Sequence, residues 1–208
     1  MTPMADQILQ RVRTDGRGAR VYAPRDFLDL GSRAAVDQAL SRLVRSGALR
    51  RVARGLYDWP RQSAVLTSPP PASMQAVVDA ICRRRNVSIA GSDLAAANAL
   101  GLTTAVPTRP EYVASRKMRD VKVGGRTLHF KQAPAALLPW FGSPAAPLVQ
   151  AMLWLHARNQ LSDDALARLR RGSSPQARKA LAQGMGRLPT WALPIARQLA
   201  ANHANGPR

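Results

Sequence analysis

The chain has few acidic residues, one cysteine and few aromatic side chains, and each shortage excludes a class of protein. Its 208 residues include 12 Asp and Glu against 31 Lys and Arg, which leaves a net charge of +19. The single cysteine, Cys82, excludes an intrachain disulfide framework and a metal cluster built on several cysteines. Aromatic residues make up 5%, yet 46% of the residues are hydrophobic, which is enough for a core and argues against wholesale disorder.

Long hydrophobic runs are also absent. The longest uncharged segment, residues 132–157, is broken by Pro134, Pro139, Pro144 and Pro147. Proline interrupts helices, so this segment does not form one continuous membrane-spanning helix. The first residues, MTPMADQILQRVR, carry acid and amide groups where a signal peptide needs an apolar stretch. We therefore expect a soluble, cytoplasmic protein.

Lysine is scarce, since only four of the 31 basic residues are lysine and the rest are arginine. Arginine and alanine excess accompanies G+C-rich coding, so part of the charge reflects composition alone. Even so, a charge of +19 on so small a chain attracts polyanions and speeds encounters with them. Nucleic acid is the partner that the composition favours.

Patterns typical of an active site are missing. The three histidines, His129, His156 and His203, are far apart and fit no metal-binding spacing. The pair Gly124-Gly125 lacks the lysine and the helix of a phosphate-cradling loop and is typical of a hairpin turn. We therefore predict that the protein is not an enzyme and has no catalytic residues, metal site or cofactor.

The first sixty residues predict a winged helix-turn-helix. Apolar residues recur with helical spacing in three segments, and Gly31 and Gly47 end the second and third of them. Ser32 is a good N-cap for the third helix. A tight turn at residues 53–55 joins two short strands after it. The expected helices are 3–13, 24–30 and 32–46, and the expected strands are 21–22, 49–52 and 56–59.

A proline-rich stretch separates this module from the rest of the chain. Residues 61–72 (RQSAVLTSPPPA) have no periodicity and contain three successive prolines, which favours an extended spacer. We place the domain boundary there, with residues 1–60 before it and 73–208 after it. The second region predicts a small antiparallel sheet, with strands at 111–114, 121–123 and 127–131. Its expected helices are 73–85, 92–100, 147–159, 163–171, 175–183 and 189–202. The predicted fold class is α+β and helix-rich.

The third predicted helix carries the most specific functional signal. If its apolar residues face the core, a basic and polar face points outward, and such a helix fits the major groove of DNA. Arg33 is suited to a bidentate bond with guanine, Gln38 to one with adenine, and Ala34 to a thymine methyl group. The alternative is an ordinary amphipathic helix with a solvated arginine face. The remaining residues, expected at phosphates, are Ser32, Arg42 and Arg45.

The hairpin after this helix strengthens the DNA-binding interpretation. Arg50, Arg51 and Arg54 crowd a short hairpin, and the only acidic residue near them in sequence is Asp58. Arginine at a projecting tip suits a minor groove or the flanking phosphates. A hairpin that only completes a small core would explain its apolar residues but not these arginines.

A second basic cluster lies in the second region. Six basic residues fall within sixteen positions, opposed only by Asp120. On paired strands some of them would share one face, which would extend a DNA-binding surface or recognise RNA. The alternative is a solvated sheet edge whose charge prevents aggregation. The cluster comprises Arg116, Lys117, Arg119, Lys122, Arg126 and Lys131.

Two segments resemble AbiEi-type antitoxins. Residues 40–60 (LSRLVRSGALRRVARGLYDWP) resemble the N-terminal winged helix of that family, in which a helix, a glycine and a hairpin with a Gly-hydrophobic-Tyr step recur. Residues 88–131 are similar to the core of its second domain, with an Ala-Ala-Asn-Ala-Leu-Gly-Leu helix end at 96–102 and a Val-Pro step at 106–107. Together the two segments that resemble the family cover about a third of the chain.

This resemblance implies an antitoxin of a type IV toxin–antitoxin pair. In such a pair the N-terminal domain binds double-stranded DNA in its own promoter and represses the operon. The C-terminal region counters a nucleotidyltransferase-like toxin. The residues themselves support only a basic DNA-binding module joined to a second domain. A winged-helix protein-interaction adaptor and an RNA-binding regulator therefore remain as alternatives, and the oligomeric state stays open.

Overall fold

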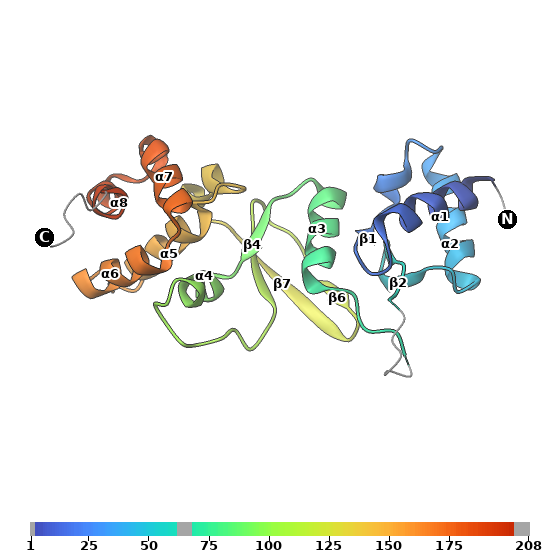
Figure 1. Cartoon of the computed structure of the whole chain (residues 1–208), viewed down its shortest axis with the longest axis horizontal. Coiled ribbons are helices and arrows are strands. Elements are labelled where there is room, and N and C mark those ends of the chain that lie inside the picture. Colours follow the sequence, from blue (N-terminus) through green and yellow to red (C-terminus); the bar gives the residue numbers. More distant parts are fainter. Residues whose placement is uncertain (1–2, 62–67, 202–208) are drawn as a thin grey trace, which may run out of the picture. The chain divides into compact units, whose positions relative to one another are not determined.

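Helices and short strands follow one another along the chain in the computed structural model, which describes residues 3–61 and 68–201 (Figure 1). They form two units. The first unit contains the described residues up to Val87 together with 120–128, and the second contains 88–119 and the described residues from His129 onward. The predicted fold class, α+β and rich in helix, is confirmed.

The first unit begins with a winged helix-turn-helix. A small antiparallel sheet in the order β1-β3-β2 packs with two helices over a core that includes Ile8, Phe27 and Leu40. The second predicted helix, 24–30, is in fact a single 3-10 turn, and the chain reaches the next helix through a turn that ends at Gly31. In chain order the elements are α1 (Pro3–Asp15), β1 (Val21–Tyr22), η1 (Pro24–Phe27), α2 (Arg33–Arg45), β2 (Arg50–Ala53) and β3 (Leu56–Asp58).

Three more elements complete the first unit. They are α3 (Met74–Arg85), β6 (Val121–Val123) and the start of β7 (Arg126–Gln132). Ser73 caps α3 by accepting a hydrogen bond from the Ala76 amide, and the helix ends at Asn86 in the left-handed region. The first unit therefore extends beyond the predicted 1–60 domain. The predicted linker at 61–72 stays a prediction, because its residues 62–67 lie outside the described part of the chain.

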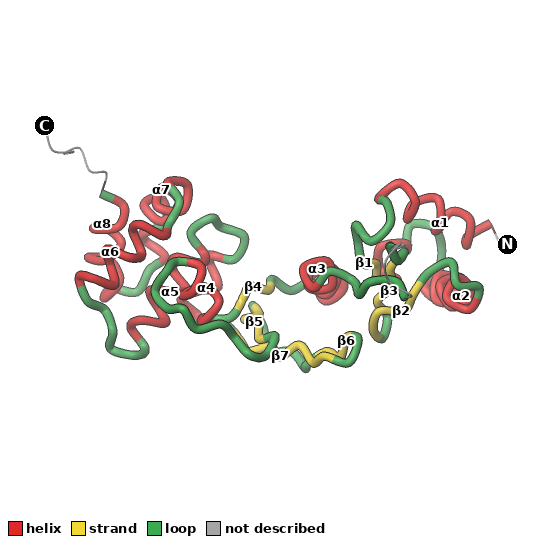
Figure 2. The backbone as a smooth tube through the Cα atoms, turned by 60° about the horizontal axis from the view of Figure 1, so that its bottom comes forward, coloured by secondary structure: helices red, strands yellow, loops and turns green. Residues whose placement is uncertain are grey.

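The second unit has a small sheet and a group of helices (Figure 2). The strand β4 was not predicted, and it pairs antiparallel with β5. The last residues of β7 pair parallel with β5, so this sheet is mixed rather than purely antiparallel as expected. The elements are β4 (Ile89–Gly91), α4 (Asp93–Ala99), β5 (Glu111–Ala114), η2 (Ala135–Trp140), α5 (Ala146–His156), α6 (Asp163–Gly172), α7 (Pro175–Gln183), η3 (Met185–Arg187), η4 (Thr190–Ala192) and α8 (Leu193–Ala200).

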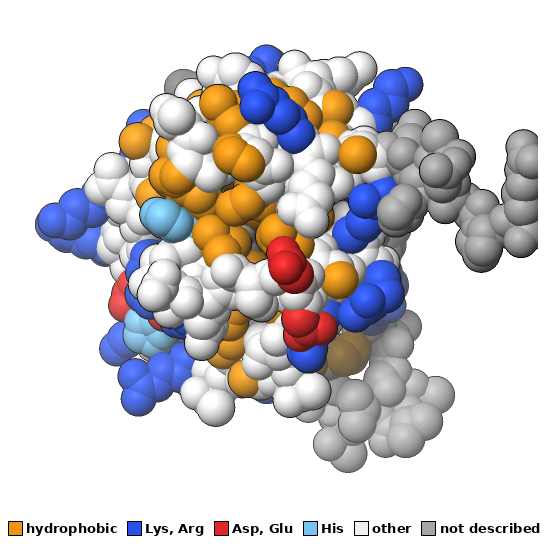
Figure 3. Space-filling view, turned by 90° about the vertical axis from the view of Figure 1, so that its left-hand side faces the viewer, with side chains coloured by type: hydrophobic (Ala, Val, Ile, Leu, Met, Phe, Trp, Pro, Cys, Tyr) orange, Lys and Arg blue, Asp and Glu red, His pale blue; other side chains and the backbone are white. Residues whose placement is uncertain are grey.

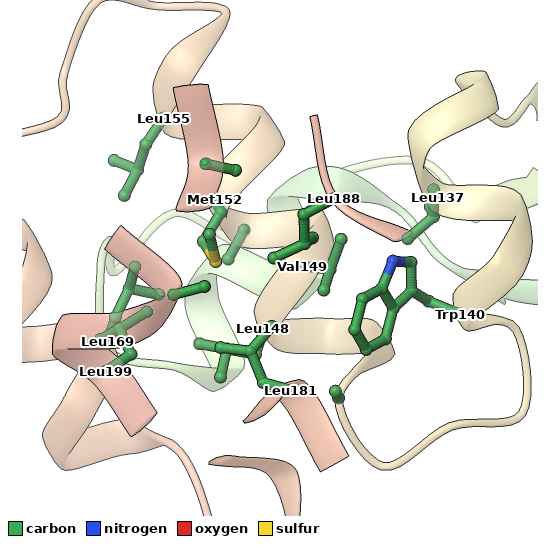
Figure 4. Close-up of a cluster of buried hydrophobic side chains, with 14 of the residues drawn as sticks. Leu137, Trp140, Leu148, Val149, Met152, Leu155, Leu169, Leu181, Leu188 and Leu199 are labelled. Carbon is green, nitrogen blue, oxygen red and sulfur yellow. The ribbon is translucent and has the colours of Figure 1, made fainter. Parts of the chain in front are cut away.

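The core of the second unit gathers around α5. Leu148 and Met152 are buried there among side chains from η2, α6, α7 and α8, including Trp140 and Leu169 (Figure 4). Serine caps fix the starts of the surrounding helices. Ser92, Ser162 and Ser174 each accept a hydrogen bond from the backbone amide three residues later.

Candidate nucleic-acid interface

The helix α2 presents a polar face to solvent because its apolar residues recur on one side. Val36, Leu40 and Leu43 are buried in the core of the winged helix. The hydroxyl of Ser32 accepts a hydrogen bond from the Ala35 amide at 3.3 Å and so fixes the start of the helix. The predicted DNA-facing residues of this helix are all exposed: Arg33, Ala34, Gln38, Arg42 and Arg45.

Arg33 stands at the first position of α2 and forms an ion pair with Asp37 one turn later. Its Nε donates to Asp37 Oδ2 at 2.8 Å, and the two side chains are 59% and 46% exposed. Such an exposed pair adds only about 0.3–0.5 kcal/mol to stability. Its geometric effect matters more, because the bond at Nε leaves both terminal nitrogens of Arg33 available for a bidentate contact.

The hairpin β2–β3 projects a basic turn. Gly55 forms this turn with φ +69°, a conformation that favours glycine over other residues. Arg54 lies beside it and is exposed, and Arg51 is exposed on β2. Both were predicted to contact DNA, and both side chains point into solvent from the hairpin.

Arg50 differs from its neighbours because its guanidinium is bound within the protein, and its predicted DNA contact stays a prediction. Its guanidinium forms two hydrogen bonds with Asp58, Nε to Oδ1 at 3.0 Å and Nη2 to Oδ2 at 2.6 Å. Its Nη1 donates to the carbonyl oxygens of Pro69 and Pro70. All three nitrogens of Arg50 are therefore engaged within the protein. The residue joins the hairpin to the segment before α3 and is not a free cation at the tip.

The last turn of α3 lies over the hairpin turn and adds residues that the sequence analysis missed. Arg84 Nη1 donates to the carbonyl oxygen of Arg54 at 2.7 Å. The pKa of Arg84 is lowered, first by burial and then by the positive charges of Arg85, Arg33 and Arg54. The charge of Arg33, at the start of α2, and that of Arg54, at the hairpin turn, therefore both act on Arg84. Arg33 and Arg54 were predicted as parts of one surface, and Arg84 interacts electrostatically with both.

Acidic residues neutralise only some of the arginines of the first unit. Asp15, Asp26, Asp29, Asp37 and Asp58 take part in ion pairs there. The arginines in these pairs are Arg11, Arg20, Arg33, Arg50 and Arg83. Six arginines on α2, the hairpin and α3 form no ion pair with any acidic residue that the structure describes: Arg42, Arg45, Arg51, Arg54, Arg84 and Arg85.

The second basic cluster is divided between the two units. Lys122 and Arg126 belong to the first unit, and the other four residues, Arg116, Lys117, Arg119 and Lys131, belong to the second. Lys131 pairs with Glu111 at 2.9 Å. The register of β6 and β7 places Arg126 opposite Val123 and Lys122 opposite Thr127, hence on opposite faces of the hairpin. A single nucleic-acid surface made of all six residues therefore stays a prediction.

Arg126 lies near the hairpin arginines of the first unit. It lines a cavity of about 340 Å³ together with Arg51, Val52 and Met74. The β6–β7 turn thus adds a basic residue, Arg126, beside Arg51 of β2. The extension of the DNA-binding surface to Arg126 stays a prediction.

Family comparison covers most of the chain. A family model described as "Family of unknown function (DUF6088)" matches residues 7–171. The chain belongs to the DUF6088 family. No curated protein matches it. The crystal structure of RV2827C protein from Mycobacterium tuberculosis is similar at 16% sequence identity and a TM-score of 0.39, covering 99% of this chain and 84% of that one. A likeness of this size does not establish a shared fold or function.

The match to DUF6088 includes every residue of the candidate interface, since α2, the hairpin β2–β3 and α3 all lie within residues 7–171. Among residues 3–61 and 68–201, no group of three or more His, Cys, Asp or Glu is arranged to hold a metal ion. Within the same described ranges, no helix is both long and apolar enough to cross a membrane.

The second unit of this DUF6088 member has a partly apolar surface of its own. Figure 3 looks onto the end of this unit, where apolar side chains gather with Lys and Arg around them. The exposed His156 stacks on Trp191 with ring centroids 3.7 Å apart, and Arg158 lies over the ring of Trp154 at 4.4 Å. These contacts cover part of the indole surface and leave the rest of the two half-buried rings at the surface.

Proposed function

We propose that this DUF6088 member is a sequence-specific DNA-binding repressor of the antitoxin type. The observation that carries the proposal is that Arg33 and Arg54, from two separate elements, both lower the pKa of Arg84 by their positive charge, while Arg84 also donates a hydrogen bond to the carbonyl oxygen of Arg54. Guanidinium groups from α2 and from the hairpin turn together suit a surface that lies across a double helix.

Base reading is assigned to the first half of α2. Arg33 starts the helix with its terminal nitrogens available, and Ala34 and Gln38 are exposed on the following turn. The major groove admits a helix of this width and presents guanine O6 and N7 to arginine and adenine N6 and N7 to glutamine. This half of the helix therefore supplies the sequence preference.

Phosphate binding is assigned to the flanking arginines. Arg42 and Arg45 are exposed on the second half of α2, and Arg51 and Arg54 are exposed on the hairpin. None of them is neutralised by an acidic residue within the described ranges. Contacts of this kind fix the position of the protein on the duplex and make its affinity depend on salt.

The antitoxin assignment rests on the resemblance of residues 40–60 and 88–131 to AbiEi-type antitoxins. By that likeness the protein represses its own promoter, and the C-terminal region, residues 73–208, counters a nucleotidyltransferase-like toxin. Co-expression with such a protein from the adjacent reading frame tests this half of the proposal. Growth arrest that is relieved by the full chain supports it, whereas arrest that persists with the full chain contradicts it.

A gel-shift assay on the DNA upstream of the gene tests the repressor half. The doubly substituted variant Arg42→Ala/Arg45→Ala should bind about 100-fold more weakly than wild type, because two charge-assisted contacts are lost. The matched control is Arg168→Ala, which removes an exposed arginine of the second unit that pairs with Asp164. Equal affinity of all three proteins, or no binding of the wild type, contradicts the proposal and favours a protein-interaction adaptor.

A further inference from the structure

The last turn of α3 is held firmly on the winged helix. Arg83 Nη2 donates to the carbonyl oxygen of Val21 at 2.7 Å, and its Nε bonds Asp26 at 3.3 Å. In the opposite direction, Arg25 Nη1 donates to the carbonyl oxygen of Arg83 at 3.2 Å. These three bonds fix where the next two residues, Arg84 and Arg85, stand relative to α2 and the hairpin.

Arg84 closes over the hairpin turn at short range. Besides its bond to the Arg54 carbonyl, its Cζ would lie only 3.3 Å from a Cβ atom placed on Gly55. A side chain at position 55 would therefore meet both the strained φ and the guanidinium of Arg84. The hairpin turn at Gly55 and the last turn of α3 therefore pack closely against each other, and this contact leaves Arg84 half-buried.

Positive charge gathers at this contact without an acid to balance it. Arg33, Arg54 and Arg85 all act on Arg84, and among residues 3–61 and 68–201 the only acidic residue paired with any of these four is Asp37, which binds Arg33. The positive charges of Arg33, Arg54 and Arg85 therefore repel that of Arg84. A bound anion would replace this repulsion with attraction, and phosphate matches the geometry of the guanidinium group.

We propose that Arg84 and Arg85 form, with Arg33 and Arg54, a site for a backbone phosphate of duplex DNA, so that α3 is a third element of the interface. Arg84 is also a positioning residue, because its bond to the Arg54 carbonyl holds the hairpin turn. This inference rests on the proposed DNA-binding function. It adds that a helix outside the winged helix-turn-helix contributes directly to binding.

Salt-dependent binding to the upstream DNA tests this site with three variants. Arg85→Ala should lower the affinity about tenfold, the effect of one lost charge-assisted contact. It should also reduce the slope of log affinity against log salt by about 0.9. The thermal midpoint should stay unchanged, because no hydrogen bond of the Arg85 side chain is present among the described residues.

Arg84→Lys and Arg84→Gln separate the phosphate contact from the support of the turn. Lysine keeps the charge, so Arg84→Lys should retain most of the salt slope, whereas Arg84→Gln should lose about 0.9 of it. If both variants weaken binding equally and neither changes the slope, Arg84 has only a supporting role and the phosphate site is wrong.

Two reference variants distinguish failure of this inference from failure of the proposed function. Arg13→Ala removes an exposed arginine at the end of α1 and should bind like wild type. Arg42→Ala removes a proposed phosphate contact of α2 and should weaken binding. If Arg42→Ala weakens binding while Arg85→Ala and Arg84→Gln bind like wild type, the inference fails and the proposed function stands. If wild type does not prefer duplex DNA, both fail.

Discussion

Arg50 and Asp58 stand opposite each other on β2 and β3 and form a two-pronged ion pair, with Nη2 and Oδ2 2.6 Å apart. The Asp58 side chain is 1% exposed and that of Arg50 30%. A buried carboxylate needs such a partner, because desolvation without one costs several kcal/mol. The pair therefore stabilises the hairpin whose turn carries Arg54.

Removing one partner of this pair should destabilise the first unit. For Asp58→Asn we expect a loss of about 2 kcal/mol in the free energy of unfolding, below the ~3–5 kcal/mol of a fully buried pair because solvent reaches Arg50. Urea denaturation measures the loss. The exposed pair Arg33–Asp37 provides the control, and Asp37→Asn should cost about 0.5 kcal/mol or less. Equal effects of the two substitutions would contradict the structural role of Asp58.

Adjacent arginines on β2 should give opposite phenotypes. Arg51→Ala should weaken DNA binding about tenfold and leave the unfolding midpoint unchanged, because its side chain is exposed and unpaired within the described part of the chain. Arg50→Ala should lower the midpoint, because it leaves Asp58 buried without its cation. Binding isotherms and thermal melts of both variants make the comparison. The assignment of roles is wrong if Arg50→Ala keeps full stability.

Arg33 should control the preference at one base position. Arg33→Ala should cost about 1–3 kcal/mol of binding free energy for the preferred base and remove the discrimination there. Competition between duplexes that differ by single base pairs measures this effect. By contrast, Arg54→Ala should weaken binding to all duplexes alike and flatten the salt dependence. An unchanged base preference in Arg33→Ala would exclude the proposed guanine contact.

Tyr22 should make the first unit sensitive to alkaline pH. Burial and the hydrogen bond from its hydroxyl to Asp15 Oδ2 raise its pKa above the ordinary value. The folded state thus holds the proton more tightly than the unfolded chain. The resulting stability is fully present below a pH of about 10 and is lost as the pH rises through and beyond it.

Hydrogen-exchange protection factors of the amides of β1 and β3, compared at about pH 9, where the stability is complete, and about pH 11, where part of it is lost, report this change. The Tyr22→Phe variant should show a weaker dependence on pH, since phenylalanine has no proton to lose. Tyr112→Phe, in the second unit, is the matched control and should leave the dependence of the first unit unchanged. A pH profile of Tyr22→Phe identical to that of wild type would contradict the prediction.

Local sequence signals predicted most of the helices, whereas contacts between residues far apart in the chain could not be predicted from the sequence. The start of α2 at Ser32 and the turn at Gly55 followed from capping and turn chemistry, which act over a few residues. The strand β4 was not predicted, because a strand of three residues is too short to show a recognisable alternation of apolar and polar residues. The division of β7 between two units depends on pairings that no local pattern encodes.

The candidate site shows the same limit. The exposed face of α2 was predicted correctly from helical spacing, because burial of Val36 and Leu40 fixes the opposite face. Arg84 was missed because its partner, Arg54, lies 30 positions away in the chain. Asp58 was visible as the nearest acid to Arg50, but only the strand register shows that the two residues pair.

The most direct test is equilibrium binding of the wild-type chain to its own upstream duplex and to a shuffled duplex of equal length, over a range of salt concentrations. We expect about 1,000-fold tighter binding to the upstream duplex. We also expect a log–log salt slope near −5, as about six arginine–phosphate contacts would give. Equal affinity for both duplexes, or a preference for single-stranded RNA, would contradict it.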